Sequence, residues 1–305
     1  MENKDILNRY SLLYGEEYPL IKELERSFNA VSKTEQFSSL FKLALEFAAD
    51  DTLKPHMDTM RETLGDASSV HNIVSILVGE QKHIPNGFKN LLTRFDGPAL
   101  QDAFSQGQIE SKKWITDVVN ELDINLGDVT YVCAGWYGLL SALLFERCGD
   151  RVNKIYSIDI DPTTENVADI LNKPYVADDV RFKAIVKDIH DLEYEDDYHT
   201  VTYYKYKDLV SYEIEMDEII VDNVNTVINT SCEHVENFDM WWDSIPDGTL
   251  VILQNNNFEE HDDSSVVNTV QSEQRWVDRV NVSELLYRGT LSLPKYKRFM
   301  VIGIK

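Results

Sequence analysis

Cysteine is scarce in this chain of 305 residues, which contains only three: Cys133, Cys148 and Cys232. Three scattered cysteines form neither a disulfide framework nor a zinc site of paired cysteines, so we expect buried, reduced thiols. The sequence also lacks any uninterrupted run of roughly 18 to 20 apolar residues, the length that a membrane helix needs. Its first residues show no signal-peptide pattern. These absences predict a cytoplasmic protein without a membrane partner.

The sequence also has few positively charged residues. It contains 29 lysines and arginines and 53 aspartates and glutamates, which gives a net charge of −24. Such a chain repels duplex DNA unless its basic residues gather on one face. The nearest candidates, Lys205 with Lys207 and the run 295–298, are expected to be solvated strand ends. The charge predicts a small-molecule or protein substrate and argues against nucleic acid, although mimicry of nucleic acid stays an alternative. The sequence indicates no oligomeric state.

The hydrophobic pattern divides the chain into two parts. From Ile6 to about Val119 apolar residues recur at helical spacing, and we predict an all-α N-terminal domain over residues 1–112. Later, short apolar runs alternate with helical stretches, which is typical of a mostly parallel sheet with helices on both faces. We predict this α/β domain over residues 113–305, with strands at 129–133, 154–158, 180–186, within 218–229, and at 249–253, 285–293 and 298–304.

The last two predicted strands flank Pro294 to Lys297 and suggest an antiparallel hairpin at the end of the chain. The predicted fold class is therefore a doubly wound, seven-stranded, mostly parallel sheet with a terminal antiparallel hairpin. The segment 198–216 does not fit the alternation. An inserted strand pair and an irregular crossover are both open for it.

Two sequence features predict a cofactor site. The first strand leads into the turn Ala134-Gly135-Trp136-Tyr137-Gly138 before an apolar helix, and small residues there allow a cofactor to approach the backbone and the helix amides. The second strand ends at Asp159, followed by Ile160. A carboxylate about 20 residues after a glycine turn is placed to accept hydrogen bonds from both hydroxyls of a ribose.

With these two features and the terminal hairpin, residues 113–305 resemble the class I S-adenosylmethionine-dependent methyltransferases. The resemblance implies S-adenosylmethionine as the cofactor and favours it over NAD, because dehydrogenase sheets stay parallel at this edge. It implies a cofactor site at the following residues: Ala134, Gly135, Trp136, Tyr137, Gly138, Asp159, Ile160, Asp188, Ile189 and Asn229.

The segments after the fourth and fifth strands carry the candidate chemistry, because open α/β sheets place ligands at the carboxyl ends of their strands. We predict Glu233 and His234 as catalytic residues, with His234 as a base. We predict a substrate site formed by Ser231, Asn255, Asn257 and Tyr14, and no metal. Two alternatives stay open: Glu233 and His234 cap a helix beginning at Val235, and the amides of 254–257 lie in a surface loop.

The predicted function is S-adenosylmethionine-dependent methyl transfer to a small polar molecule or a protein. Nicotianamine synthases are similar in layout and in the segment Asp159 to Pro162, so aminocarboxypropyl transfer is an alternative. A third possibility is a non-catalytic, cofactor-binding protein, since Trp136 and Tyr137 occupy positions that smaller residues often hold in the family.

Overall fold

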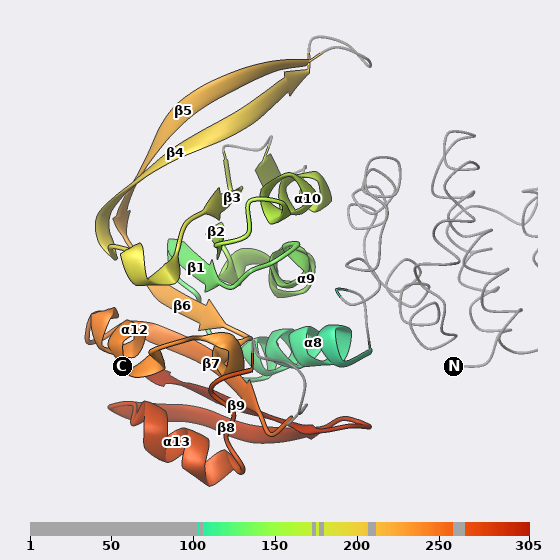
Figure 1. Ribbon diagram of the computed structural model, residues 1–305, viewed down its shortest axis with the longest axis vertical. Helices are drawn as coiled ribbons and strands as arrows, with labels where there is room; N and C mark the ends of the chain where they lie inside the picture. Colours follow the sequence, from blue (N-terminus) through green and yellow to red (C-terminus); the bar gives the residue numbers. More distant parts are fainter. Residues whose placement is uncertain (1–102, 104–105, 173–174, 177–179, 207–211, 259–265) are drawn as a thin grey trace, which may run out of the picture.

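The computed structural model describes residue 103 and residues 106–305, apart from 173–174, 177–179, 207–211 and 259–265 (Figure 1). The predicted helical N-terminal domain, with Tyr14, therefore lies almost entirely outside the described residues. The first described helix, α8 (Gln106–Glu121), runs across the predicted domain boundary at residue 113 and packs against α9 (Leu139–Cys148). The division at that residue stays a prediction.

A seven-stranded sheet forms the centre of the described chain (Figure 1). Its strand order is β3-β2-β1-β6-β7-β9-β8. All neighbours pair in parallel except β7 with β9 and β9 with β8, which are antiparallel. The strands are β1 (Val129–Cys133), β2 (Lys154–Asp159), β3 (Phe182–Val186), β6 (Thr226–Asn229), β7 (Leu250–Asn256), β8 (Glu284–Ser292) and β9 (Lys297–Ile304). The predicted fold class, including the terminal hairpin, is confirmed.

Two hydrophobic cores lie on opposite faces of this sheet, because successive strand side chains point to opposite sides. On one face, Val132 of β1 packs with residues of α8 and α9. On the other face, Tyr131 and Cys133 pack with Phe238 and Trp241 of α12 (Phe238–Ser244) and with Trp276 of α13 (Glu273–Val280). Both faces are covered, which explains why nearly every position of the central strands β1, β6 and β7 is buried.

The segment that did not fit the alternation is a strand pair. β4 (Glu195–Tyr206) and β5 (Tyr212–Asn223) form a separate antiparallel sheet whose base packs into the second core through Val201 and Val221. The far half of this hairpin extends beyond the main sheet (Figure 1). Of the two alternatives, the inserted strand pair is therefore the correct one.

A buried polar cluster joins the base of the hairpin to β1. The Tyr131 hydroxyl donates to Asp197 Oδ2 at 3.1 Å and lies 2.9 Å from His199 Nε2. Lys187 Nζ donates to Asp197 Oδ1 at 2.7 Å. His199 is only 3% exposed, and burial lowers its pKa to about 4, against the opposing attraction of Asp197. The imidazole is therefore neutral at physiological pH.

This lowered pKa predicts a pH dependence of stability. His199 takes up a proton near pH 6.5 in the unfolded chain but only near pH 4 in the folded chain. The contribution of neutral His199 to the free energy of unfolding is therefore fully present above pH 6.5 and is lost as the pH falls toward 4. One such group contributes up to about 3 kcal/mol. In urea unfolding at pH 7.0, 5.5 and 4.5, His199→Gln should lose less stability on acidification than the wild type. Identical pH slopes would show that His199 is not the group responsible.

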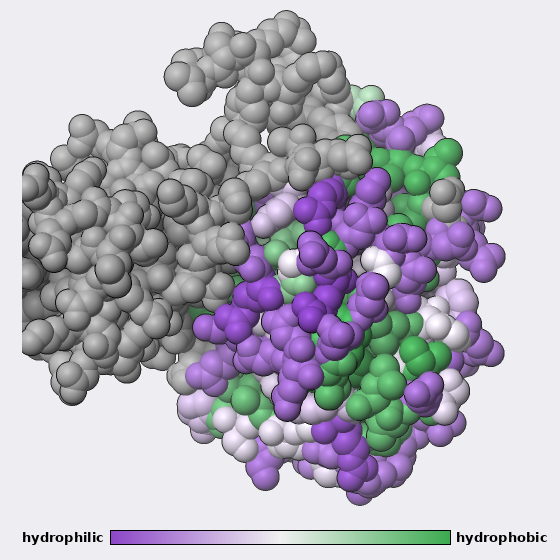
Figure 2. Space-filling model, turned by 180° about the vertical axis from the view of Figure 1, so that it is seen from behind, coloured by the Kyte–Doolittle hydropathy of each residue, from purple (hydrophilic) through white to green (hydrophobic). Residues whose placement is uncertain are grey.

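The three cysteines are buried and free, as expected. On the face seen in Figure 2, hydrophilic residues cover much of the described surface, with hydrophobic patches between them. Among the residues that the structure describes, no helix is both long and apolar enough to cross a membrane.

Candidate functional site

The turn between β1 and α9 has an unusual backbone. Ala134, Trp136 and Gly138 all have positive φ angles, of 51°, 47° and 70°. The Gly138 amide donates to the Gly135 carbonyl at 3.0 Å, which closes the turn. Residues other than glycine rarely adopt this region, and such strain is concentrated at functional sites. The turn therefore has the backbone expected of a binding loop.

Gly135 has a packing role that the sequence did not predict. A Cβ atom at this position would lie 2.0 Å from Ser157 Oγ of β2 and 3.0 Å from the Val132 carbonyl oxygen. The absence of a side chain allows the turn to pack on β2, with the Gly135 amide donating to the Ile158 carbonyl at 3.0 Å. This contact orients the turn, and Gly135 itself does not line the pocket described below.

Gly135→Ala is consequently expected to destabilise the protein by about 1 to 3 kcal/mol, the usual cost of overpacking a tight core. The free energy of unfolding from urea titration measures this loss. Because the shortest contact is to Ser157 Oγ, the same substitution should cost less in a Ser157→Ala background. An equal cost in both backgrounds would contradict the contact with Ser157.

Asp159, at the end of β2, supports the turn directly. Its Oδ2 accepts a hydrogen bond from the Trp136 amide at 2.8 Å, and its Oδ1 accepts one from the Asp161 amide at 3.0 Å. Burial raises the pKa of the Asp159 carboxyl, while these backbone donors oppose the rise. A carboxylate has about four acceptor positions, more than these backbone donors occupy, so Asp159 can still accept a hydrogen bond from a ligand.

A pocket of about 580 Å³ opens beside Asp159, at the edge of the sheet where the parallel strands end. This volume is within the usual range for small-molecule sites. The loops after β1, β2, β3 and β6 all contribute to it. Its lining residues are Ala134, Asp159, Ile160, Asp188, Ile189, His190, Ser231, His234, Val235, Glu236 and Asn237.

The structure thus brings seven predicted site residues together, from positions spread over a hundred residues of sequence. They are Ala134, Asp159, Ile160, Asp188, Ile189, Ser231 and His234. Asp188 also caps the short 3-10 helix η3 (Ile189–Asp191), where its Oδ1 accepts from the His190 amide at 2.9 Å. The other four lining residues were not predicted.

Several predicted site residues lie outside this lining. Trp136 and Tyr137 stack on each other, with ring centroids 5.1 Å apart. Asn255 is fully buried and donates to the Asn268 carbonyl at 2.9 Å, and Asn257 Oδ1 accepts from the Lys297 amide at 2.7 Å. These two amides hold the end of β7 in place. Gly135, Gly138, Glu233 and Asn229 are also absent from the lining.

Asn229 nevertheless has a polar atom available beside the pocket. Its Oδ1 accepts from the amide of Ser231, a lining residue, at 2.8 Å. Its Nδ2 is buried without a hydrogen-bond partner among the described residues, as is Nδ1 of the lining residue His190. Asp159 and His190 line the pocket, and they offer acceptors and a ring nitrogen to a ligand that has both donors and acceptors.

Glu233 and His234 differ in position although they are adjacent in sequence. His234 faces the pocket with 43% of its side chain exposed, whereas Glu233 is buried and pairs with Arg298 Nη2 at 3.2 Å. Both lie in the 3-10 helix η4 (Cys232–His234), and α12 begins only at Phe238. The expectation of a helix beginning at Val235 is therefore wrong, and neither residue caps such a helix.

The alternative that the amides of 254–257 lie in a surface loop is wrong for the first three of them. Gln254, Asn255 and Asn256 belong to β7 and pair with Met300, Phe299 and Arg298 of β9. Arg298 is only 4% exposed, so its prediction as a solvated strand end is wrong. Glu233 compensates its charge: burial disfavours the guanidinium, but Glu233 and Tyr296 raise the pKa of Arg298.

The chain is similar to known proteins in structure, at low sequence identity. No protein-family model matches the chain, and no curated protein matches it significantly in sequence. Magnesium protoporphyrin IX methyltransferase from Synechocystis with bound SAH has a TM-score of 0.46 at 11% identity, covering 72% of this chain and 93% of that one. A SAM-dependent methyltransferase from Aquifex aeolicus has a TM-score of 0.43 at 13% identity, covering 69% and 99%.

The strand order and directions of this chain are the observations that decide its fold. Five parallel strands are followed at one edge by the antiparallel β9 and then by β8. The chain has the class I methyltransferase fold. Among the described residues, no group of three or more His, Cys, Asp or Glu side chains could hold a metal ion.

Proposed function

We propose that the pocket beside Asp159 binds S-adenosylmethionine and that the protein transfers its methyl group to a small polar molecule or a protein. The observation that carries the proposal is the gathering of Asp159, Asp188 and His234 around one pocket at the carboxyl edge of this sheet. Open α/β sheets bind their ligands at this edge.

Within this proposal each part of the pocket has a role. Asp159 accepts hydrogen bonds from the ribose hydroxyls, and the loop at Asp188 and Ile189 borders the adenine. Asn229 Nδ2 donates to the amino acid arm of the cofactor. A sulfonium carries an already activated methyl group, so the main task of the protein is to align the acceptor with it.

His234 is the proposed base. It lies on the pocket wall, and an imidazole nitrogen can accept a proton. As the acceptor nitrogen or oxygen bonds to the methyl carbon, the bond from that carbon to sulfur breaks, and His234 takes the proton that the acceptor loses. Glu233 Oε1 lies 4.0 Å from His234 Nε2.

Calorimetry with the full-length protein tests the proposal. S-adenosylmethionine and S-adenosylhomocysteine should both bind, and NAD should bind at least tenfold more weakly. If neither S-adenosylmethionine nor S-adenosylhomocysteine binds at 1 mM, the proposal is refuted. Mass spectrometry of the products then identifies the group transferred: S-adenosylhomocysteine indicates methyl transfer, and methylthioadenosine would indicate aminocarboxypropyl transfer.

A further inference from the structure

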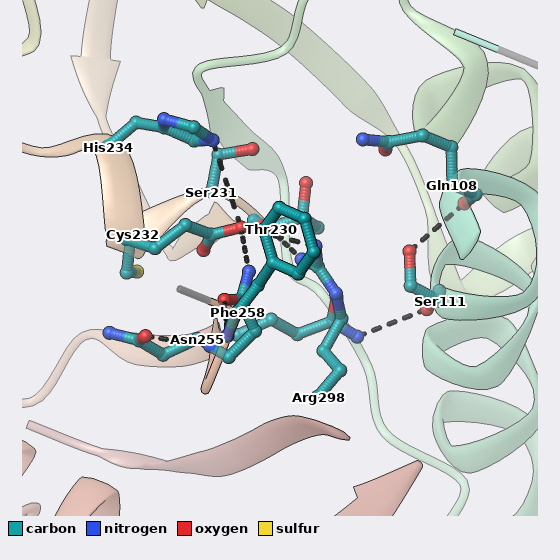
Figure 3. A network of polar contacts seen from close by, with 12 residues as sticks. Gln108, Ser111, Thr230, Ser231, Cys232, His234, Asn255, Phe258 and Arg298 are labelled. Atoms are coloured by element: carbon teal, nitrogen blue, oxygen red, sulfur yellow. Dashed lines mark hydrogen bonds and ion pairs between the residues drawn. The ribbon is translucent and has the colours of Figure 1, made fainter. Parts of the chain in front are cut away.

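A second buried polar cluster lies between the sheet and α8 (Figure 3). It consists of Glu233 from η4, Gln254 and Asn256 from β7, and Arg298 from β9. Their exposed fractions are 2%, 0%, 5% and 4%. Charged and amide groups are rarely buried so completely unless a partner satisfies them.

Hydrogen bonds fix the orientation of these side chains. Glu233 Oε1 accepts from Arg298 Nη2 at 3.2 Å and from Asn256 Nδ2 at 2.5 Å. Arg298 Nη1 donates to the Thr230 carbonyl, and Gln254 Nε2 donates to the Ser111 carbonyl of α8 at 3.1 Å. The cluster is therefore rigid before any ligand binds, a condition for tight recognition.

Three polar atoms of this fixed cluster remain unpaired. Glu233 Oε2, Gln254 Oε1 and Arg298 Nε are each buried without a hydrogen-bond partner among the described residues. Native proteins leave few such atoms, and each needs an explanation such as a bound ligand or water. Two of the three accept a hydrogen bond, and the third donates one.

The chemistry of these atoms selects a class of ligand. Glu233 Oε2 and Gln254 Oε1 require N–H or O–H donors, whereas Arg298 Nε requires an oxygen. The charges of Glu233 and Arg298 already compensate each other. A ligand with a net charge would unbalance this buried pair, but a group that carries one positive and one negative charge would not.

We propose that Glu233, Gln254 and Arg298 recognise the amino acid head group of the acceptor. Its ammonium donates to Glu233 Oε2 and Gln254 Oε1, and one carboxylate oxygen accepts from Arg298 Nε. The inference rests on the proposed function, because it makes this cluster the acceptor side of the same site. His234 joins the two sides, since it lies on the wall of the cofactor pocket and 4.0 Å from Glu233.

Binding measurements on the full-length protein saturated with S-adenosylhomocysteine test this inference. Each of the twenty common amino acids is titrated calorimetrically, together with its N-acetyl derivative and the amine that lacks its carboxylate. At least one amino acid should bind, and both of its analogues should bind at least about tenfold more weakly, because each loses one charged hydrogen bond. A buried water filling the cluster would instead leave no amino acid bound.

Gln254→Met, which removes Oε1 but keeps the length of the side chain, should weaken amino acid binding about tenfold and change S-adenosylhomocysteine binding less than twofold. Gln274→Met on α13 is the matched control and should leave both affinities unchanged, because Gln274 is exposed and contacts Asp278 and Arg288. The analogue series on the wild type decides the matter if the Gln254 variant does not fold.

The outcomes separate the two proposals. Binding of S-adenosylhomocysteine without any amino acid, or equal binding of an amino acid and its analogues, would overturn the acceptor assignment and leave the proposed function intact. Failure of S-adenosylhomocysteine to bind would overturn both.

Discussion

Asp159→Ala is expected to weaken the binding of S-adenosylhomocysteine by about 10- to 150-fold, the equivalent of roughly 1.5 to 3 kcal/mol for the loss of hydrogen bonds to a charged group. The carboxylate has two tasks that alanine cannot perform. It holds the Trp136 amide of the turn, and it lines the pocket with lone pairs available to a ribose. Calorimetry on the purified variant measures the loss.

Asp161→Ala is the matched control for this prediction. Asp161 is two residues away and exposed, and its carboxylate accepts from the Thr163 amide outside the pocket. Its replacement should change the affinity less than threefold. If Asp159→Ala binds S-adenosylhomocysteine as tightly as the wild type, the ribose contact has been assigned to the wrong carboxylate.

Glu233→Ala is expected to destabilise the protein by about 3 to 5 kcal/mol, because it leaves the Arg298 guanidinium buried and unpaired. Both side chains are almost entirely buried, so the guanidinium would lose the charge that offsets its burial. The Asn256 amide would also lose its acceptor. The shift in the midpoint of guanidinium-induced unfolding, at a constant slope, measures the effect.

A second substitution isolates the charge as the cause. Arg298→Met in the Glu233→Ala background removes the unpaired guanidinium, and the double variant should be more stable than Glu233→Ala alone. The exposed pair of Arg279 with Asp239 provides the comparison: Asp239→Ala should cost less than about 1 kcal/mol. A loss below 1 kcal/mol for Glu233→Ala would mean that the ion pair is not closed to solvent.

The strands of the main sheet were predictable because their physical signal is local. A strand buried on both faces is rich in apolar residues, and β1 and β3 are apolar at four of their five positions without reference to the rest of the chain. The terminal hairpin was predictable in the same way, from two strand-like runs around Pro294. That connection makes β8 and β9 antiparallel to each other.

The burial of polar side chains in β7 and β9 was not predictable, because each of these side chains depends on a partner that is distant in the sequence. Amides at Gln254 and Asn256 are costly in a core until Ser111 and Glu233 satisfy them. Arg298 is likewise acceptable in the interior only because Glu233 lies beside it. No local pattern shows that residues separated by 65 or 143 positions meet.

The candidate site was predictable to the level of loops but not of side chains. Loops after parallel strands converge on one edge, so Asp159, Asp188 and His234 were placed in the same region correctly. The direction of each side chain depends on neighbours within the fold. Gly135 packs on Ser157, Asn255 bonds Asn268, and Glu233 turns inward to Arg298.

A structure of the full-length protein crystallised with saturating S-adenosylhomocysteine tests the central claim most directly. We expect the ligand in the pocket bordered by Ala134 and His234, with its ribose hydroxyls on Asp159 and its adenine beside Ile189. A ligand bound elsewhere, or this pocket free of ligand at saturating concentration, would contradict the claim that the chain uses this fold to bind S-adenosylmethionine.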